Sequence, residues 1–327
     1  MFESLLGVKV VLYGAGKNGK RWLAALLNSN INPAYFVDSN PSTDFVISDE
    51  NGGALFLVNM PNVLLNEDRQ QLKIIITPLN PYRKEIEGQI RAMGLESCLI
   101  SESVNQFECN ICCNTFPTFL PFDTIKMDDA LCPFCGSYVR HRVLWNFIEN
   151  SLCRRSHGRI KLLHFAPEMS YFERFSNNTS IDYYPVDINP ERPHIRDCVD
   201  ITNMQYEDEA FDLIVCTHVI EHVPNEKRAL SELKRVLSAS GIAYINAPVF
   251  QYLCVTLENP EYTPEERAQH YGQSDHVRKY GRDYPERLRA AGFNVDVLDN
   301  KSMTKENALK YGIPKSYRIY QCTRNDK

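Results

Sequence analysis

The sequence predicts an α/β protein built from three consecutive parts, and three observations support this prediction. Residues 9–28 read as a strand, a glycine-rich turn and a helix, and residues 211–245 read as a strand, a polar loop, a helix and a second strand. Two Cys-x-x-Cys pairs lie between these segments. We expect a small α/β domain over residues 1–104, a metal-binding module over 105–142 and a larger α/β domain over 143–327.

Length and composition describe an ordinary globular protein. The chain has 327 residues, of which 43% are hydrophobic and 24% charged, and its net charge of −5 gives no general attraction to polyanions. The start lacks a basic stretch before its first apolar run, and no apolar run approaches the length of a membrane span. We therefore expect a cytoplasmic protein without a membrane contact. The sequence predicts no particular oligomeric state.

The first part reads as a nucleotide-binding fold. A strand over Lys9 to Tyr13 leads into a Gly-x-Gly-x-x-Gly turn and a helix to Asn28, and a second strand, Ala34 to Val37, ends at an aspartate 19 residues after the last glycine. Such spacing is typical of dinucleotide sites, where glycines admit phosphates and the acidic residue holds a ribose. A later strand (73–77) and helix (82–93) complete this part. The candidate binding residues are Gly14, Gly16, Gly19 and Asp38.

The second part carries a metal signal. Two Cys-x-x-Cys pairs stand 19 residues apart, the spacing of a four-thiolate zinc ribbon. A closed four-sulfur site leaves no position for a substrate, so we expect structural zinc. Cys113 could replace one ligand, and a redox-active pair is the minor alternative. The candidate ligands are Cys109, Cys112, Cys132 and Cys135.

A basic stretch follows the cysteines. Residues 136–161 hold six arginines and lysines against one glutamate. It could contact phosphate in a nucleotide-linked sugar or an RNA backbone, or it could be a solvated helix face.

The third part places polar residues after a buried strand. The strand Phe211 to Cys216 is followed by Thr217, His218, Glu221 and His222, at the strand end where ligands bind in open α/β sheets. The pattern then predicts a helix over 225–240 that ends at Gly241, a strand over 242–245, an irregular substrate lid over 247–284, a helix over 285–291 and closing strands over 293–298 and 317–323.

These segments resemble a class I S-adenosylmethionine-dependent methyltransferase with a Rossmann-like sheet and an antiparallel closing strand. The resemblance rests on FDLIVCTHVIEHV, on the following helix that ends in RVL, and on IDYYPVDINP and CVDITNMQ. It implies that Asp187 holds the ribose of S-adenosylmethionine and that Asp200 and Ile201 hold its adenine. Ile188 and Thr217 are further candidates for cofactor binding.

The first turn of this part departs from the usual pattern. His164 stands in the place of the usual acidic residue, and Ala166, Pro167 and Glu168 replace the expected glycines. The HFAPE turn and the later HYGQSDHVRKYGRD stretch resemble a subset of uncharacterised methyltransferase-like proteins, which implies a cofactor pocket built differently from the usual one. We take His164, Ala166 and Glu168 as cofactor-binding candidates, although His164 could equally be a hydrogen-bonded core imidazole.

A histidine is the usual base near neutral pH. His270, His276 and His218 are the candidates, with Asp275 to orient one of them, whereas His222 more often supports the loop in this family.

The first part is similar to nucleotide-sugar-binding domains of sugar acyltransferases and to Rossmann-like accessory domains of some sugar methyltransferases. The resemblance implies a bound nucleotide or nucleotide sugar, and a scaffold without ligand is the alternative. We therefore predict methyl transfer to a small, sugar-like or nucleotide-linked acceptor. An RNA methyltransferase that uses the ribbon for binding, and a catalytically degenerate binding protein, are the rival hypotheses.

Overall fold

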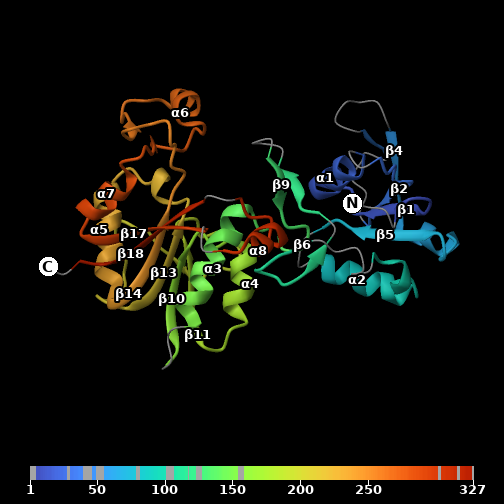
Figure 1. Cartoon of the computed structure of the whole chain (residues 1–327), viewed down its shortest axis with the longest axis horizontal. Coiled ribbons are helices and arrows are strands. Elements are labelled where there is room, and N and C mark those ends of the chain that lie inside the picture. The colour runs from blue at the N-terminus through green and yellow to red at the C-terminus, as the bar shows by residue number, and fades with distance from the viewer. Residues whose placement is uncertain are drawn as a thin grey trace. The chain divides into compact units, whose positions relative to one another are not determined.

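The computed structural model describes residues 5–27, 30–39, 46–48, 55–78, 82–100, 107–116, 118–122, 127–153, 158–300, 303–314 and 317–325 (Figure 1). The chain divides into two compact units, and each contains a segment from near the C-terminus. Unit 1 is Met1–Trp145 with Met303–Lys315, and unit 2 is Asn146–Ser302 with Ser316–Lys327. Within the described ranges, no helix is long and apolar enough to cross a membrane. The three-part division with boundaries at 104 and 142 stays a prediction.

Unit 1 contains a five-stranded sheet in the order β3-β4-β2-β1-β5, parallel except for β3. The predicted strands and helices of this part are confirmed to within a few residues, but β3 and β4 were not foreseen; the predicted helix end at Asn28 lies outside the described residues. The elements are β1 (Lys9–Tyr13), α1 (Lys17–Leu27), β2 (Tyr35–Val37), β3 (Val46–Ser48), β4 (Leu55–Asn59), η2 (Pro61–Asn66), β5 (Leu72–Ile76), α2 (Tyr82–Ala92) and η3 (Glu96–Cys98).

The cysteine-bearing segment is a pair of two-stranded ribbons joined to a helix. The ribbons pair β6 (Phe107–Glu108) with β7 (Thr115–Phe116) and β8 (Leu120–Phe122) with β9 (Met127–Leu131), and α3 (Val139–Cys153) follows. A short helix from near the C-terminus, α8 (Lys305–Lys310), belongs to the same unit.

The fully buried Arg142 side chain connects this late segment to the ribbons. Its guanidinium donates to the carbonyl oxygens of Tyr311 at 2.8 Å and Gly312 at 3.2 Å, and to those of Ala130 at 3.1 Å and Ser137 at 2.8 Å. One planar group thus satisfies four backbone acceptors from three stretches of chain.

The basic stretch predicted over residues 136–161 is buried in part where the structure describes it. Arg142 is buried by its four carbonyl partners, and Arg159 donates to the carbonyl of Ile181 at 2.9 Å. Arg154 and Arg155 lie outside the described residues. Arg142 therefore serves the fold, whereas Arg159 and Lys161 stay exposed.

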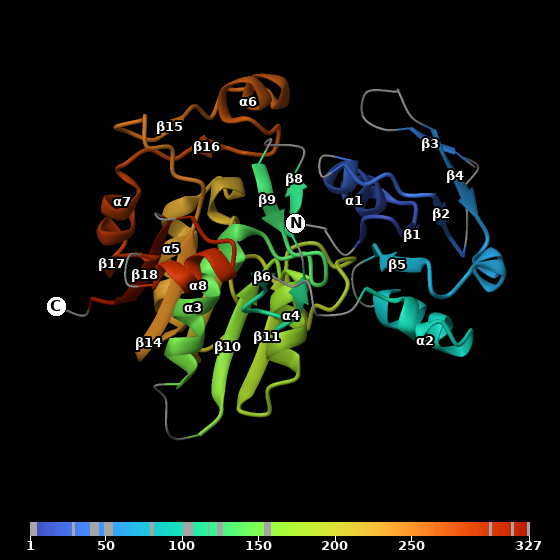
Figure 2. The ribbon, with the colours of Figure 1, turned by 45° about the vertical axis from the view of Figure 1, so that its right-hand side comes forward.

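Unit 2 is a seven-stranded sheet in the order β12-β11-β10-β13-β14-β18-β17. The first five strands of this order are parallel, and β18 is antiparallel to both of its neighbours. Helix α4 lies on one face, and α5 and α7 lie on the other (Figure 1; Figure 2). The predicted α/β fold with an antiparallel closing strand is confirmed. The elements are β10 (Ile160–Phe165), α4 (Met169–Ser176), β11 (Ile181–Asp187), β12 (Asp197–Cys198), β13 (Phe211–Thr217), η6 (Ile220–His222), α5 (Glu226–Val236), β14 (Leu237–Asn246), α7 (Tyr284–Ala290), β17 (Phe293–Asp299) and β18 (Arg318–Arg324).

The predicted role of Gly241 as a helix stop is wrong. Helix α5 ends at Val236, and β14 already begins at Leu237, so Gly241 lies inside a strand. A Cβ at position 241 would lie 2.5 Å from Leu237 Cδ1, and the pairing register of β13 and β14 shifts in this region. The glycine therefore permits the close approach that an irregular strand needs.

The lid segment contains more regular structure than the sequence indicated. Helix α6 (Pro264–Tyr271) begins with a capping box in which Thr263 and Glu266 bond each other's backbone N–H groups, and it ends at Gly272 with φ +94°. Two short strands, β15 (Leu257–Glu258) and β16 (Arg278–Lys279), form a hairpin beside it.

Candidate functional site

A cavity of about 840 Å³ lies where the strand order of unit 2 reverses, between β10 and β13. In open α/β sheets, ligands bind at this switch point, beyond the carboxyl ends of the strands. The structure brings five predicted cofactor residues and two predicted catalytic residues to its wall, and these are Ala166, Asp187, Ile188, Asp200, Ile201, His218 and Asp275.

The first turn keeps a left-handed backbone without a glycine. Ala166 has φ +47°, a conformation that normally favours glycine, and its N–H donates to the Val186 carbonyl at 2.9 Å. The turn therefore retains the backbone path that a glycine would provide, at a strain of about 1 kcal/mol or more. The strained residue also lines the cavity, as strained residues often do at functional sites.

His164 lies beneath the cavity, fully buried, and both ring nitrogens have partners inside the protein. Nε2 lies 2.9 Å from Glu168 Oε2, and Nδ1 lies 2.8 Å from the Tyr183 hydroxyl. Burial raises the pKa of the Tyr183 hydroxyl. Thr217 donates to the other oxygen of Glu168 at 2.9 Å. His164 is thus a hydrogen-bonded core imidazole that supports the turn, and neither nitrogen is left for a cofactor.

The two aspartates that follow β11 and β12 shape one side of the cavity. Asp187 accepts the backbone N–H of Asn189 at 2.9 Å and the Arg192 Nε at 3.1 Å. Asp200 accepts both the N–H and the hydroxyl of Thr202 at 2.7 Å. Arg192 thus occupies one oxygen of Asp187, so a ligand hydroxyl at that oxygen would have to share or displace this arginine.

His218 joins the main cavity to a second one. It lies directly after β13 with φ +55°, and its Nδ1 lies 3.3 Å from Glu221 Oε1. The second cavity measures about 390 Å³ and is walled by Pro248, Phe250 and Tyr320, among others. His218 therefore lines both the main cavity and the smaller, largely apolar cavity.

The other candidate bases separate into two places. His270 lies on α6, where its ring stacks on Tyr262 with centroids 4.6 Å apart, and it does not line the main cavity. His276 is buried and packs edge to face against His222, with centroids 4.7 Å apart. Burial, together with the neighbouring His222, lowers the pKa of His276, so its neutral form is favoured. Asp275 lies 3.2 Å from His222 Nδ1 rather than beside His276.

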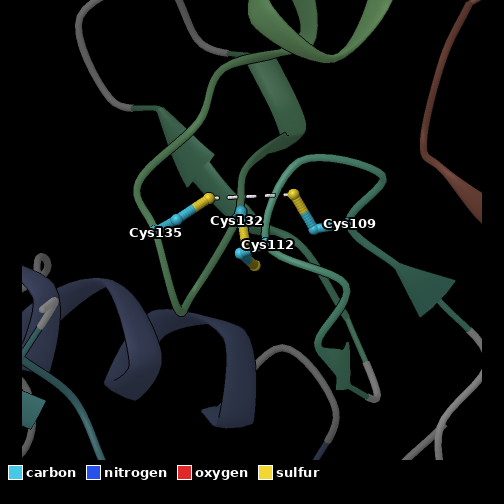
Figure 3. Close-up of side chains that lie close together, drawn as sticks. All are labelled: Cys109, Cys112, Cys132 and Cys135. Carbon is cyan, nitrogen blue, oxygen red and sulfur yellow. Dashed lines mark hydrogen bonds between the residues drawn. The ribbon is translucent and has the colours of Figure 1, made fainter. Parts of the chain in front are cut away.

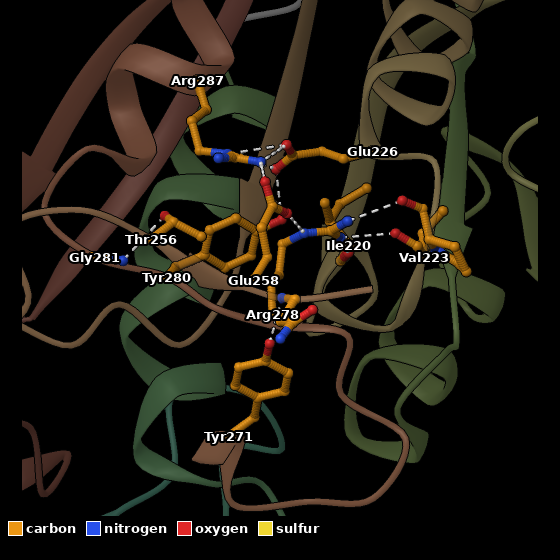
Figure 4. A network of polar contacts seen from close by, with 12 residues as sticks. Ile220, Val223, Glu226, Thr256, Glu258, Tyr271, Arg278, Tyr280, Gly281 and Arg287 are labelled. Carbon is orange, nitrogen blue, oxygen red and sulfur yellow. Dashed lines mark hydrogen bonds and ion pairs between the residues drawn. The ribbon is translucent and has the colours of Figure 1, made fainter. Parts of the chain in front are cut away.

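Arg278 fixes the turn that carries Glu221 and His222 to the lid. Its guanidinium donates to the carbonyls of Ile220 at 2.8 Å, Val223 at 2.7 Å and Pro224 at 3.0 Å, and its Nε bonds Glu258 at 3.0 Å (Figure 4). The sequence indicated a polar lid but gave no sign that this arginine was buried.

Glu226 and Arg287 extend the same network. Arg287 pairs with Glu226 and with Glu258, and the Tyr280 hydroxyl donates to Glu226 at 2.7 Å (Figure 4). The base of the lid is therefore attached to α5 and α7 as well as to the turn.

In unit 1, the four predicted ligand cysteines form one cluster (Figure 3). The Sγ atoms of Cys109 and Cys135 are 3.7 Å apart, and those of Cys112 and Cys132 are 3.8 Å apart. A tetrahedral ion with metal–sulfur bonds of about 2.3 Å requires sulfurs about 3.8 Å apart, so the cluster fits zinc. Cys113 is exposed and lies outside the cluster.

The buried Arg142 and the half-buried Arg83 lie in the field of these sulfurs. Cys132 and Cys112 contribute favourable charge interactions to Arg83, and all four cysteines do so for Arg142. Four thiolates and one Zn²⁺ would carry a net charge of −2, which the Arg142 guanidinium balances in part, since Arg83 also pairs with Glu87 at 3.2 Å.

The glycine-rich turn of unit 1 has two glycines that the fold requires and one that it does not. A Cβ at Gly19 would lie 2.2 Å from the Gly14 carbonyl oxygen, and one at Gly14, where φ is +108°, would lie 2.5 Å from Thr77. A Cβ at Gly16 would meet nothing within 4 Å. Asp38 is the residue predicted to hold a ribose. It accepts the Ala15 N–H at 2.9 Å and therefore lies against the turn.

Residues 163–245 match the family described as a methyltransferase domain, which is about a quarter of the chain. Together with the sheet order, this match gives unit 2 a Rossmann-like methyltransferase fold. S-adenosylmethionine is the cofactor expected for this fold.

Among curated proteins, a 44-residue stretch is 41% identical to an uncharacterised protein of Methanocaldococcus jannaschii. The match covers 14% of this chain and only 19% of that relative.

Among solved structures, the [4+2]-cyclase SpnF is similar at 18% identity and a TM-score of 0.40, over 55% of this chain and 81% of that one. A Burkholderia thailandensis 1,6-didemethyltoxoflavin-N1-methyltransferase, solved with S-adenosylhomocysteine, is similar at 14% identity and a TM-score of 0.36, over 57% and 83%. Likeness of this extent implies nothing about activity.

Proposed function

We propose that unit 2 is a methyltransferase that binds S-adenosylmethionine in the 840 Å³ cavity and methylates a small acceptor. The observation that carries the proposal is the meeting of Ala166, Asp187 and Asp200 at one switch-point cavity, inside a segment that matches a methyltransferase domain. These residues come from three different strand ends, as expected of a site built by the sheet.

The residues present fit the cofactor. Asp187 can accept two ribose hydroxyl protons once Arg192 moves. The turn at Asp200 and Ile201 offers adenine a hydrogen-bonding edge and an apolar surface. When bound, S-adenosylmethionine supplies an electrophilic methyl group and its own leaving group. The protein then has to align the acceptor and take up its proton.

The second cavity supports a small acceptor. Its aromatic and apolar wall is typical of small-molecule sites, and His218 stands where it meets the main cavity. We propose His218 as the proton acceptor because it is the one candidate base that lines both spaces. The sugar-like or nucleotide-linked nature of the acceptor rests on the resemblance of the first domain, where Gly16 leaves room for a phosphate.

RNA stays the rival acceptor, and the burial of one basic side chain is an argument against it. Arg142, the central arginine of the basic stretch, donates to backbone carbonyls, so it is not available to a phosphate backbone, and the exposed basic residues placed in that stretch are Arg159 and Lys161.

Calorimetry with S-adenosylhomocysteine on the full-length, zinc-replete protein tests the proposal. We expect binding by the unaltered chain and its loss in Asp187→Ala. Asp182→Ala is the matched control, because Asp182 lies on the same strand but does not line the cavity. Absence of heat with the unaltered chain would leave a binding protein with a methyltransferase fold.

The proposed nucleotide site in unit 1 needs the whole chain for its test. Residues 303–315 belong to that unit, so a fragment such as 1–104 would remove part of it. We expect nucleoside diphosphate sugars to raise the melting temperature of the full chain. The proposal fails if neither these sugars nor dinucleotides change it.

A further inference from the structure

The turn after β13 and the lid bring one carboxylate and two imidazoles together. Glu221 and His222 belong to η6, and His276 precedes β16. Each offers one ligand atom, and these atoms all lie within 4.8 Å of one another. The three residues, called here the Glu-His-His cluster, are separate from the four cysteines of unit 1.

The Glu221 carboxylate is the unusual member of this cluster. Its side chain is 2% exposed, and neither oxygen accepts a hydrogen bond in the described part of the chain. His218 Nδ1 lies 3.3 Å from Oε1 without forming a hydrogen bond. A buried carboxylate without donors is strongly unfavourable unless a cation balances it.

The cluster is also held in place before any ligand arrives. The Val277 N–H donates to the Glu221 carbonyl at 2.9 Å, which ties the residue after His276 to the turn. Arg278 bonds three further carbonyls of the same turn. Since both chain segments are fixed to each other through their backbones, the side chains between them keep a constant spacing, as a metal site requires.

We propose that Glu221, His222 and His276 bind one divalent transition-metal ion. Two imidazoles and a carboxylate suit zinc, manganese or iron better than magnesium or calcium, which prefer all-oxygen ligands. Three protein ligands leave at least one position open, as in catalytic metal sites, in contrast to the closed four-sulfur site of unit 1.

The position of the cluster gives the ion a task. His222, Asp275 and His218 line the main cavity, so the ion would be next to the bound ligands. The ion would bind the hydroxyl oxygen of the acceptor and lower the pKa of that hydroxyl. The hydroxyl proton passes to His218, the oxygen forms a bond to the methyl carbon, and the carbon–sulfur bond breaks to release S-adenosylhomocysteine. This task rests on the proposed function, whereas metal binding itself does not.

Cobalt titration of the full-length protein tests the site. The four-cysteine site is first filled with zinc, and Co²⁺ is then added without cofactor. We expect one further equivalent to bind with weak visible bands and no sulfur-to-metal charge transfer. Glu221→Gln and His276→Gln should each weaken cobalt binding at least about tenfold, since even outer partners of metal sites contribute that much.

His270→Gln is the matched control, because it removes a lid histidine outside the cluster and should bind cobalt as the unaltered chain does. Retention of one zinc per chain and an unchanged melting profile show that each variant is folded. The proposal is overturned if the unaltered chain takes up no second metal, or if Glu221→Gln binds cobalt equally well. S-adenosylhomocysteine binding is measured separately, on protein whose Glu-His-His cluster holds no metal. Absence of cobalt binding is therefore distinct from failure of the proposed function.

Discussion

Replacing Arg278 with lysine should loosen the turn that carries the Glu-His-His cluster. The guanidinium makes four contacts, to the carbonyls of Ile220, Val223 and Pro224 and to Glu258. A lysine ammonium is a single point and would keep at most two of them. Each lost bond from a charged donor is worth about 1.5–3 kcal/mol, so the loss of two bonds should lower the local opening free energy by about 3–6 kcal/mol.

Hydrogen exchange of the Val277 amide measures this change, because that amide bonds the Glu221 carbonyl across the contact. A loss of about 3–6 kcal/mol corresponds to exchange faster by about two to four orders of magnitude, provided that local opening limits exchange. Arg282→Lys is the control, since its side chain donates to Cys254 and not to the turn. Unchanged protection of Val277 in Arg278→Lys would refute the view that this arginine holds the turn.

Four further outcomes are expected. Ala166→Gly should relieve the left-handed backbone and stabilise unit 2 by up to about 1 kcal/mol, seen as a melting temperature about 2–4 °C higher; a lower value would contradict the strain argument. Gly19→Ala should cost about 1–3 kcal/mol in denaturant unfolding, because its Cβ would meet the Gly14 carbonyl. Gly16→Ala should leave stability unchanged and weaken only nucleotide binding, a difference that calorimetry would reveal. Cys109→Ser should lower zinc content by one ion per chain and the melting temperature of unit 1, and unchanged values of both would exclude a structural metal.

Local patterns in the sequence predicted the elements near the cavity because their signals are local. The run Phe211 to Cys216 is a buried strand in the structure, and the polar residues after it reach the cavity because parallel strands end at one edge. The cysteine spacing predicted the cluster for the same reason, since each Cys-x-x-Cys pair turns two sulfurs toward one point.

Features that depend on distant contacts were not foreseen. Gly241 read as a helix stop because the preceding residues have helical spacing, yet the close approach of Leu237 decides its place in a strand. Glu221 read only as one of the polar residues after the strand, because nothing in its neighbours shows that its carboxylate is buried without a donor. The capping box at Thr263 was a local signal that could have predicted α6.

The discontinuity of unit 1 bears on how the chain acquires its structure during translation. Domains generally fold in the order in which they leave the ribosome, N-terminal first. Here the acceptors at Tyr311 and Gly312 emerge only after most strands of the other sheet, so a nascent chain carries the Arg142 charge with two of its four acceptors missing. The first unit to be synthesised is thus completed late, and a chaperone that retains nascent chains would act on it longest.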